Sequence, residues 1–154
     1  MTVAEHILET ISYATIATAS DNGEPWNTPV FYAHDGFTIY WSSHPDAVHS
    51  KNIAANGKAF VAIYNSKAGK GEGTGLYIRA KARALDSEDE IRHALDLLGA
   101  RRGRPFLHAE KFKGNGPQRV YVAEPLKIWT NAADRDSDGD FIRDFRISAE
   151  VNPD

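Results

Sequence analysis

A cluster of polar residues runs from the end of a predicted strand into a predicted helix, next to the aromatic Trp41. The polar members are Ser42, Ser43, His49, Lys51 and Asn52. Hydroxyl groups donate hydrogen bonds, a helix N-terminus carries partial positive charge, and a lysine or a protonated histidine adds a full charge. This set can hold a phosphate group, with the Trp41 ring as a flat apolar surface beside it. The alternative is structural, with Ser43 capping the helix and Lys51 exposed to solvent.

A second candidate site is the basic segment 100–119. Its charged residues are Arg101, Arg102, Arg104, Lys111, Lys113 and Arg119, against the single acidic residue Glu110. Residues 131–154 are acidic, and the net charge of the chain is −3. A basic segment can attract nucleic acid or an anionic small molecule, but one cluster in an acidic protein is a weak signal for nucleic acid. We therefore expect no nucleic-acid partner, and Arg104, His108 and Lys111 bordering a site for a small anionic substrate. The alternative is that the basic segment and the acidic tail attract each other.

Several other chemistries find no support in the sequence. The absence of cysteine excludes disulfides, iron–sulfur clusters, thiolate zinc sites and cysteine nucleophiles, and it favours a cytoplasmic setting. None of the six histidines forms an i,i+4 pair on one predicted helix, so we expect no metal site. Ligation of haem by a single histidine stays open. The aspartates of 134–140 resemble half of a calcium loop, but Phe145 takes the place of its final glutamate, which favours a solvated hairpin turn.

The length and composition indicate one soluble domain spanning residues 1–154. The chain is 42% hydrophobic and 25% charged, as is usual for a globular domain. Its apolar stretches are far shorter than the roughly 20 residues that cross a bilayer, so no membrane partner is expected. The first residues lack the basic and apolar regions of a secretory signal.

The predicted elements are mostly strands joined by tight turns. Thr2-x-x-Glu5 is a capping box that predicts a short helix at the start of the chain. Alternating apolar residues and turn signals predict strands at about 14–20, 26–33, 37–42, 59–65, 75–85 and 119–130, with a further short strand at 141–148. Helices are expected at 43–56, at 87–99 with a stop at Gly99, and for one turn near 106–112. The fold class is therefore mainly β, or α+β by content, with antiparallel strands forming a barrel flanked by short helices.

The order of several short motifs resembles the flavin-binding split-barrel family related to pyridoxamine 5′-phosphate oxidase. The motifs are Gly23-Glu24-Pro25, Thr28-Pro29-Val30-Phe31-Tyr32, the run from Asp35 to Ser43, His49-Ser50-Lys51-Asn52-Ile53, Asn56-Gly57 and the late strand Val120–Trp129. Each motif is weak alone, but together they cover most of the chain in the family's order.

The resemblance implies a six-stranded antiparallel split β-barrel that forms a homodimer with flavin mononucleotide (FMN) at the subunit interface. It implies that FMN carries the redox chemistry of an oxidoreductase, and no catalytic side chain is assigned. The implied cofactor-binding residues are Pro29, Val30, Phe31, Trp41, Ser42, Ser43, His49, Lys51 and Asn52, with Trp129 contributed by the partner. Because His49 stands where the family usually has lysine, phosphate binding is expected to strengthen as pH falls.

The same barrel also supports other functions. It is found in reductases that use the deazaflavin F420, and in non-catalytic flavin- or haem-binding proteins of the stress-response or haem-handling type. The resemblance therefore leaves FMN, F420 and haem as alternative cofactors.

Overall fold

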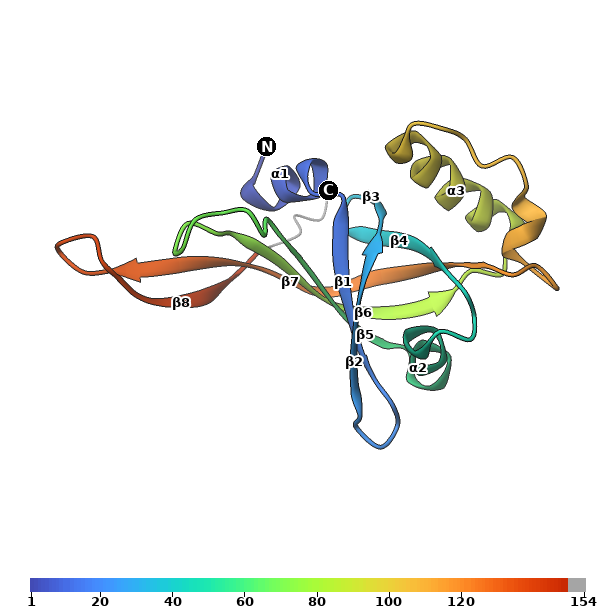
Figure 1. The fold of residues 1–154 in the computed structure, drawn as a ribbon, viewed down its shortest axis with the longest axis horizontal. Helices are drawn as coiled ribbons and strands as arrows, with labels where there is room; N and C mark the ends of the chain where they lie inside the picture. The colour runs from blue at the N-terminus through green and yellow to red at the C-terminus, as the bar shows by residue number, and fades with distance from the viewer. Residues whose placement is uncertain (150–154) are drawn as a thin grey trace.

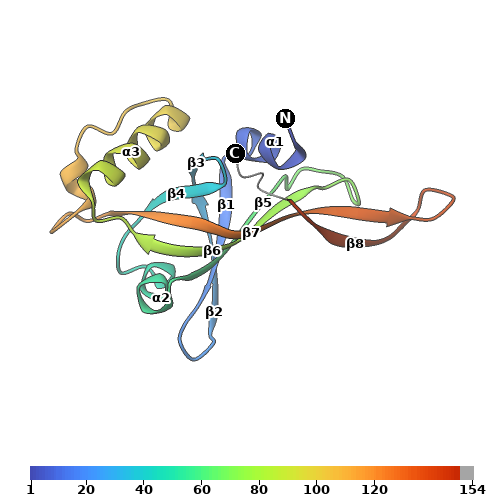
Figure 2. The ribbon, with the colours of Figure 1, turned by 180° about the vertical axis from the view of Figure 1, so that it is seen from behind.

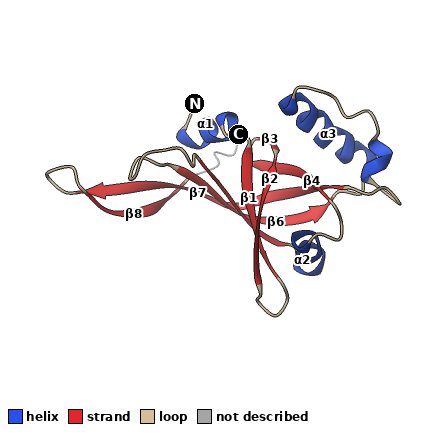
Figure 3. Cartoon of the chain, in the orientation of Figure 1, coloured by secondary structure: helices blue, strands red, loops and turns tan. Residues whose placement is uncertain are grey.

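The computed structural model describes residues 1–149, which form a curved sheet with helices packed around it (Figure 1). The elements in chain order are α1 (Val3–Thr10), β1 (Tyr13–Ala19), β2 (Pro25–Phe31), β3 (Ala33–Asp35), β4 (Thr38–Ser43), α2 (Val48–Asn56), β5 (Lys58–Tyr64), β6 (Gly75–Ala84), α3 (Glu88–Arg102), the 3₁₀ helix η1 (Ala109–Phe112), β7 (Arg119–Arg135) and β8 (Phe141–Ser148). Figure 3 shows the helices lying outside the layer of strands.

The strands pair in the order β2-β1-β5-β6-β7-β4-β3, always antiparallel, and β8 pairs with β7. β2 and β3 lie at opposite ends of this order, yet only Tyr32 separates them in the sequence. The chain therefore passes directly from one edge of the sheet to the other, which closes the sheet into a barrel. This confirms the predicted antiparallel split barrel with short flanking helices.

The strand count differs from the expected six, because the sheet has eight strands. The predicted strand 26–33 is divided into β2 and β3 at Tyr32, whose ring is fully buried and whose Oη donates a hydrogen bond to the Leu8 carbonyl at 3.1 Å. The short strand at 141–148 is present as β8 and pairs with β7, which runs to Arg135 rather than to residue 130.

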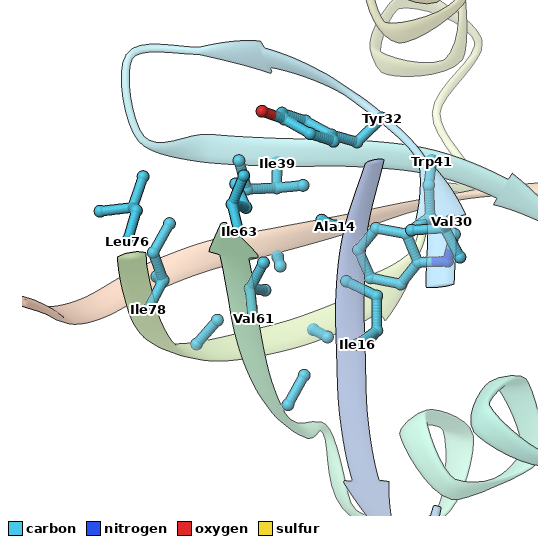
Figure 4. Packing of buried hydrophobic residues seen from close by; sticks show 14 of the residues in the cluster. Ala14, Ile16, Val30, Tyr32, Ile39, Trp41, Val61, Ile63, Leu76 and Ile78 are labelled. Carbon is cyan, nitrogen blue, oxygen red and sulfur yellow. The ribbon is translucent and has the colours of Figure 1, made fainter. Parts of the chain in front are cut away.

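Alternate residues of each strand fill the barrel interior. Ile16, Val61, Ile63, Leu76 and Ile78 are fully buried, and Figure 4 shows their side chains converging on one core. One face of α1 covers part of this core. A second apolar cluster joins α3 and η1 to β7, and its members include Leu85, Ile91, Leu95, Leu98, Phe112, Val120 and Val122.

Two helix boundaries depart from the prediction. α2 begins at Val48 instead of near Ser43, because Pro45 disfavours helical backbone at the residue before it and cannot donate a backbone hydrogen bond. Ser43 therefore does not cap the helix. α3 continues through Gly99 to Arg102 and is capped by Gly103, which has a φ of 80°. Gly99 is needed for packing, since a Cβ there would lie 3.2 Å from the Arg104 carbonyl oxygen.

Beyond the barrel, β8 and the last part of β7 form a two-stranded projection, defined as residues 131–148 and called the arm (Figures 1 and 2). Its tip is a turn in which the Asp136 carboxylate accepts hydrogen bonds from the N–H groups of Asp138 and Asp140. Residues 1–149 contain no group of three histidine or acidic side chains placed to hold a metal ion. None of the described helices is long and apolar enough to span a membrane.

Candidate functional site

A cavity of about 630 Å³ lies between the barrel and the connection from α3 to β7. Phe31 and Ser42 line it from the barrel, and Arg104, His108 and Lys111 line it from the connection. Its volume falls within the range of roughly 300–1,000 Å³ typical of small-molecule sites. The structure thus brings two residues expected to contact the cofactor together with all three expected to contact an anionic substrate.

The connection from α3 to β7, residues 103–118, is held in place by contacts among its own side chains and with Arg102. The guanidinium of Arg102 lies 3.3 Å from the centre of the Phe106 ring and donates hydrogen bonds to the carbonyls of Arg104 and Pro105. Phe106 also packs edge-to-face on Phe112 at 5.5 Å. Arg102, Phe106 and Phe112 line the cavity, although the sequence analysis did not assign them to the site. The sequence signal that could have identified them is the pair Phe106 and Phe112, which flanks His108 and Lys111 in the chain.

The cavity rim is positively charged. Arg104 and Lys111 are exposed, and neither forms an ion pair within the part of the chain that the structure describes. His108 is also exposed and has Nδ1 3.1 Å from a Glu110 carboxylate oxygen. Together with Arg102, which stacks on Phe106, three cationic side chains and one imidazole therefore line the cavity.

The end of β4 also contacts the first turn of α2. Nε2 of His49 lies 2.8 Å from Oγ of Ser43. Ser42 and Ser43 are successive residues of one strand, so their side chains leave opposite faces of the sheet. Ser42 lines the cavity, whereas Ser43 meets α2. The two hydroxyls therefore lie in different surroundings, on opposite sides of the sheet.

The N-terminus of α2 has the properties of an anion site. Its N-cap residue, Ala47, has no side chain to bond the first N–H groups, and the first turn contains no acidic residue. Ser50 is 1% exposed, and its Oγ has no hydrogen-bond partner among residues 1–149. Free N–H groups and a spare hydroxyl at a helix N-terminus suit a phosphate group. Ser50 was missed in the sequence analysis, although it lies between His49 and Lys51.

Burial lowers the pKa of His49 below its usual value. The imidazole is 5% exposed, so its charged form loses hydration. In the protein without a bound anion, His49 is therefore mainly neutral at pH 7. Lys51, one helical position beyond Ser50, is exposed.

Residues 3–132 match the family model described as pyridoxamine 5′-phosphate oxidase. The chain belongs to this family. No curated protein sequence matches it significantly.

Solved structures of the family's barrel are similar in fold despite low identity. HutZ, the haem storage protein from Vibrio cholerae, has 13% identity and a TM-score of 0.67, covering 80% of this chain and 89% of its own. A FAD-binding protein from Mesorhizobium loti has 16% identity and a TM-score of 0.63, covering 84% and 94%. General Stress Protein 26 from Bacillus anthracis has 14% identity and a TM-score of 0.61, covering 91% and 95%.

Three of the residues that the family resemblance places at the cofactor are buried inside the protein. Trp41 is fully buried and stacks on Tyr121 with ring centres 5.6 Å apart, so the expectation that its ring forms a surface for a ligand is wrong. Asn52 is buried and donates a hydrogen bond to the Thr18 hydroxyl at 3.0 Å. The side chain of Val30 packs in the barrel core. Pro29 lines a separate cavity of about 520 Å³ beside Tyr13 and Tyr64.

Trp129 lies on the outside of the barrel, away from the core. It stacks on Phe60 with ring centres 6.1 Å apart. Neighbouring outward positions of β1, β5, β6 and β7 also carry aromatic rings, and we call this surface the outer aromatic face, defined by Tyr13, Phe60, Tyr64, Tyr77 and Trp129. Phe60, Tyr64 and Tyr13 are 37%, 52% and 62% exposed.

Proposed function

We propose that this protein is a flavin-dependent oxidoreductase of the pyridoxamine 5′-phosphate oxidase-like class, with FMN as its cofactor. The observation that carries the proposal is the uncapped N-terminus of α2, whose first turn holds His49, paired with Ser43, and a Ser50 hydroxyl with no partner among residues 1–149. Ser42, the residue before Ser43, lines the cavity. Bound FMN supplies the hydride or electron transfer. The protein supplies binding, orientation and electrostatics.

The phosphate group is assigned to the first turn of α2. Ser43, His49, Ser50 and Lys51 provide two hydroxyls, one imidazole and one ammonium group, and backbone N–H groups add further donors. A phosphate favours the protonated form of His49, which gains a charge-assisted hydrogen bond and opposes the effect of burial.

The cavity is assigned to the substrate side of the flavin. Phe31 and Ser42 form its barrel wall, and Arg104, His108 and Lys111 form the basic rim. Two exposed cations at the mouth favour a small anionic substrate by raising its local concentration. We place the protein in the cytoplasm, because a chain without cysteine needs no oxidising compartment.

We also propose that the protein is a homodimer formed through the outer aromatic face. Clustered exposed aromatic rings are unusual on a monomer and typical of protein interfaces. Pairing of this face buries Phe60 and Trp129 between the two copies, and it accounts for the position of Trp129 outside the barrel. The partner's copy of this residue then lies at the interface, where the family resemblance places it.

Haem binding is the second candidate, and His108 favours it. Its ring lines the cavity, its side chain is 60% exposed, and its Nδ1 faces Glu110, which leaves Nε2 available as a ligand. A carboxylate partner at the other ring nitrogen is common for metal-bound histidine.

Absorption spectroscopy of the purified protein with FMN, F420 or haemin tests these alternatives. We expect FMN to bind at one per chain, with quenched flavin fluorescence, and to bind more weakly to Ser50→Val. If the protein binds F420 but not FMN, the proposed cofactor of this site is a deazaflavin instead of FMN. A sharp Soret band that His108→Ala abolishes, without FMN binding, would overturn the flavin proposal in favour of haem.

A further inference from the structure

The arm and the connection from α3 to β7, which carries the basic rim of the cavity, lie at opposite ends of the molecule's longest axis (Figures 1 and 2). The expectation that the basic segment and the acidic tail of one chain attract each other is therefore wrong for the described part of that tail. Arg143 and Arg146 pair with Asp134 and Asp144 within the arm. The tip residues Asp136, Asp138 and Asp140 form no ion pair with any described side chain.

The arm also exposes apolar side chains along its length. Phe145 and Ile147 are 41% and 45% exposed, and their spacing of two residues places them on one face of β8. Phe141, at 50% exposed, lies on the other side of a register shift in β8 and faces the opposite way. A two-stranded ribbon is only marginally stable by itself, so this face gains stability when something covers it. The arm thus combines an apolar face with an acidic tip.

The rim of the cavity has the complementary character. Leu107 is 77% exposed and lies between Arg104 and Lys111 in the connection. An apolar side chain flanked by two cations suits a ribbon that carries apolar side chains along one face and carboxylates at its tip. Because arm and rim are far apart within one chain, an arm can reach a rim only on another copy.

Two-fold symmetry supplies the required arrangement. A two-fold axis perpendicular to the longest axis exchanges the two ends of the molecule, which directs each arm toward the other copy's connection between α3 and β7. The interface is then continuous with the aromatic pairing proposed above, on which this inference rests. Most of the arm lies beyond residues 3–132, the part that matches the family.

We propose that the arm of each copy docks on the cavity rim of a second copy. Asp138 and Asp140 pair with Arg104 and Lys111, and the apolar face of β8 packs on Leu107. The docked tip uses the same two cations as an anionic substrate, so the arm is an exchangeable lid over the partner's cavity.

Cross-linking with engineered cysteines tests the docking directly, because the chain has no cysteine of its own. Asp138→Cys and Lys111→Cys are purified separately, mixed and mildly oxidised. We expect a disulfide-linked dimer in severalfold higher yield than in a matched mixture of Asp138→Cys with Glu24→Cys, which lies at the exposed β1–β2 turn. Inorganic phosphate and high salt are expected to lower the yield. Circular dichroism confirms that each variant is folded.

The outcomes separate this inference from the function proposed above. A parent protein that sedimentation shows to be a dimer, but that gives no more cross-link than the control, overturns the docking and leaves the aromatic interface. A monomeric parent overturns both. An oxidised double variant, Lys111→Cys/Asp138→Cys, that closes its disulfide within one chain also overturns the docking. FMN titration of the same samples measures cofactor binding independently.

Discussion

Nε2 of His49 lies 2.8 Å from Oγ of Ser43, and this contact ties the first turn of α2 to the end of β4. The histidine is buried and the helix is uncapped beside it. A group that is neutral in the free protein thus stands where an anion would favour its charged form.

The free energy of unfolding is predicted to decrease as pH falls below about 6.5, the pKa of histidine in an unfolded chain. Burial lowers the pKa of His49 in the folded state, so between the two pKa values the unfolded chain binds more protons. Stability is therefore present above this window and lost as pH falls through it. Denaturant titrations at about pH 7 and about pH 5 should show a smaller loss for His49→Gln than for the parent. Equal losses would show that His49 does not titrate in this way.

FMN affinity is predicted to increase as pH falls from about 7 toward the pKa of free His49. A bound phosphate raises the pKa of His49. Each unit of rise gives roughly tenfold tighter FMN binding once the pH is low enough to protonate His49 in both the free and the FMN-bound protein. Protonation of the phosphate, near pKa 6, opposes the trend at the acidic end. Fluorescence titrations measure the dissociation constant.

The control for this pH dependence is His49→Lys. Its charge stays constant over this range, so it should bind FMN tightly at neutral pH with a much flatter pH profile. A flat profile in the parent, together with normal binding by His49→Ala, would remove His49 from the phosphate site.

Arg101→Met is predicted to lower the free energy of unfolding by about 2–4 kcal/mol, since hydrogen bonds to charged groups contribute about 1.5–3 kcal/mol. The guanidinium donates to the carbonyls of Leu8 and Ile11 at 2.7 and 2.8 Å and lies 4.6 Å from the centre of the Tyr32 ring. It therefore joins α3 to the end of α1 and to the barrel closure. Arg92→Met on the exposed side of α3 is the control and should change stability by less than about 0.5 kcal/mol. Equal effects of the two changes would mean that the Arg101 contacts are not stabilising.

Asn52→Ala is predicted to cost about 1–3 kcal/mol, because it leaves the Thr18 hydroxyl buried without its partner. The double variant Thr18→Val/Asn52→Leu removes both polar groups and should recover part of the loss. Thermal denaturation measures both. If Asn52→Ala kept full stability but lost FMN binding, Asn52 would be a cofactor ligand, as the family resemblance implied.

Local sequence patterns predicted most of the fold. The Thr2 capping box is present in full, with hydrogen bonds in both directions between Thr2 and Glu5. Alternation predicted the buried faces of β5 and β6, because one face of each strand is apolar. The end of α3 was wrong because Gly99 serves a close approach between backbones, which is a tertiary requirement.

The candidate site was harder to predict than the fold. Trp41 has the same parity as the buried Ile39, so strand periodicity indicated an inward ring, whereas its position beside the serines suggested a ligand surface. The burial of Ser50 and the partner of His49 depend on how α2 packs, which local sequence does not specify. The basic rim was predictable because its charges are close together in the chain.

Titration of the purified protein with FMN, followed by flavin fluorescence, tests the central claim most directly. The account predicts saturable quenching at one FMN per chain, weakened in Ser50→Val and in Lys51→Ala, while the exposed-site control Lys67→Ala binds like the parent. Absence of saturable binding by the folded parent, or equal binding by all of these variants, would contradict the assignment of the α2 N-terminus as the flavin phosphate site.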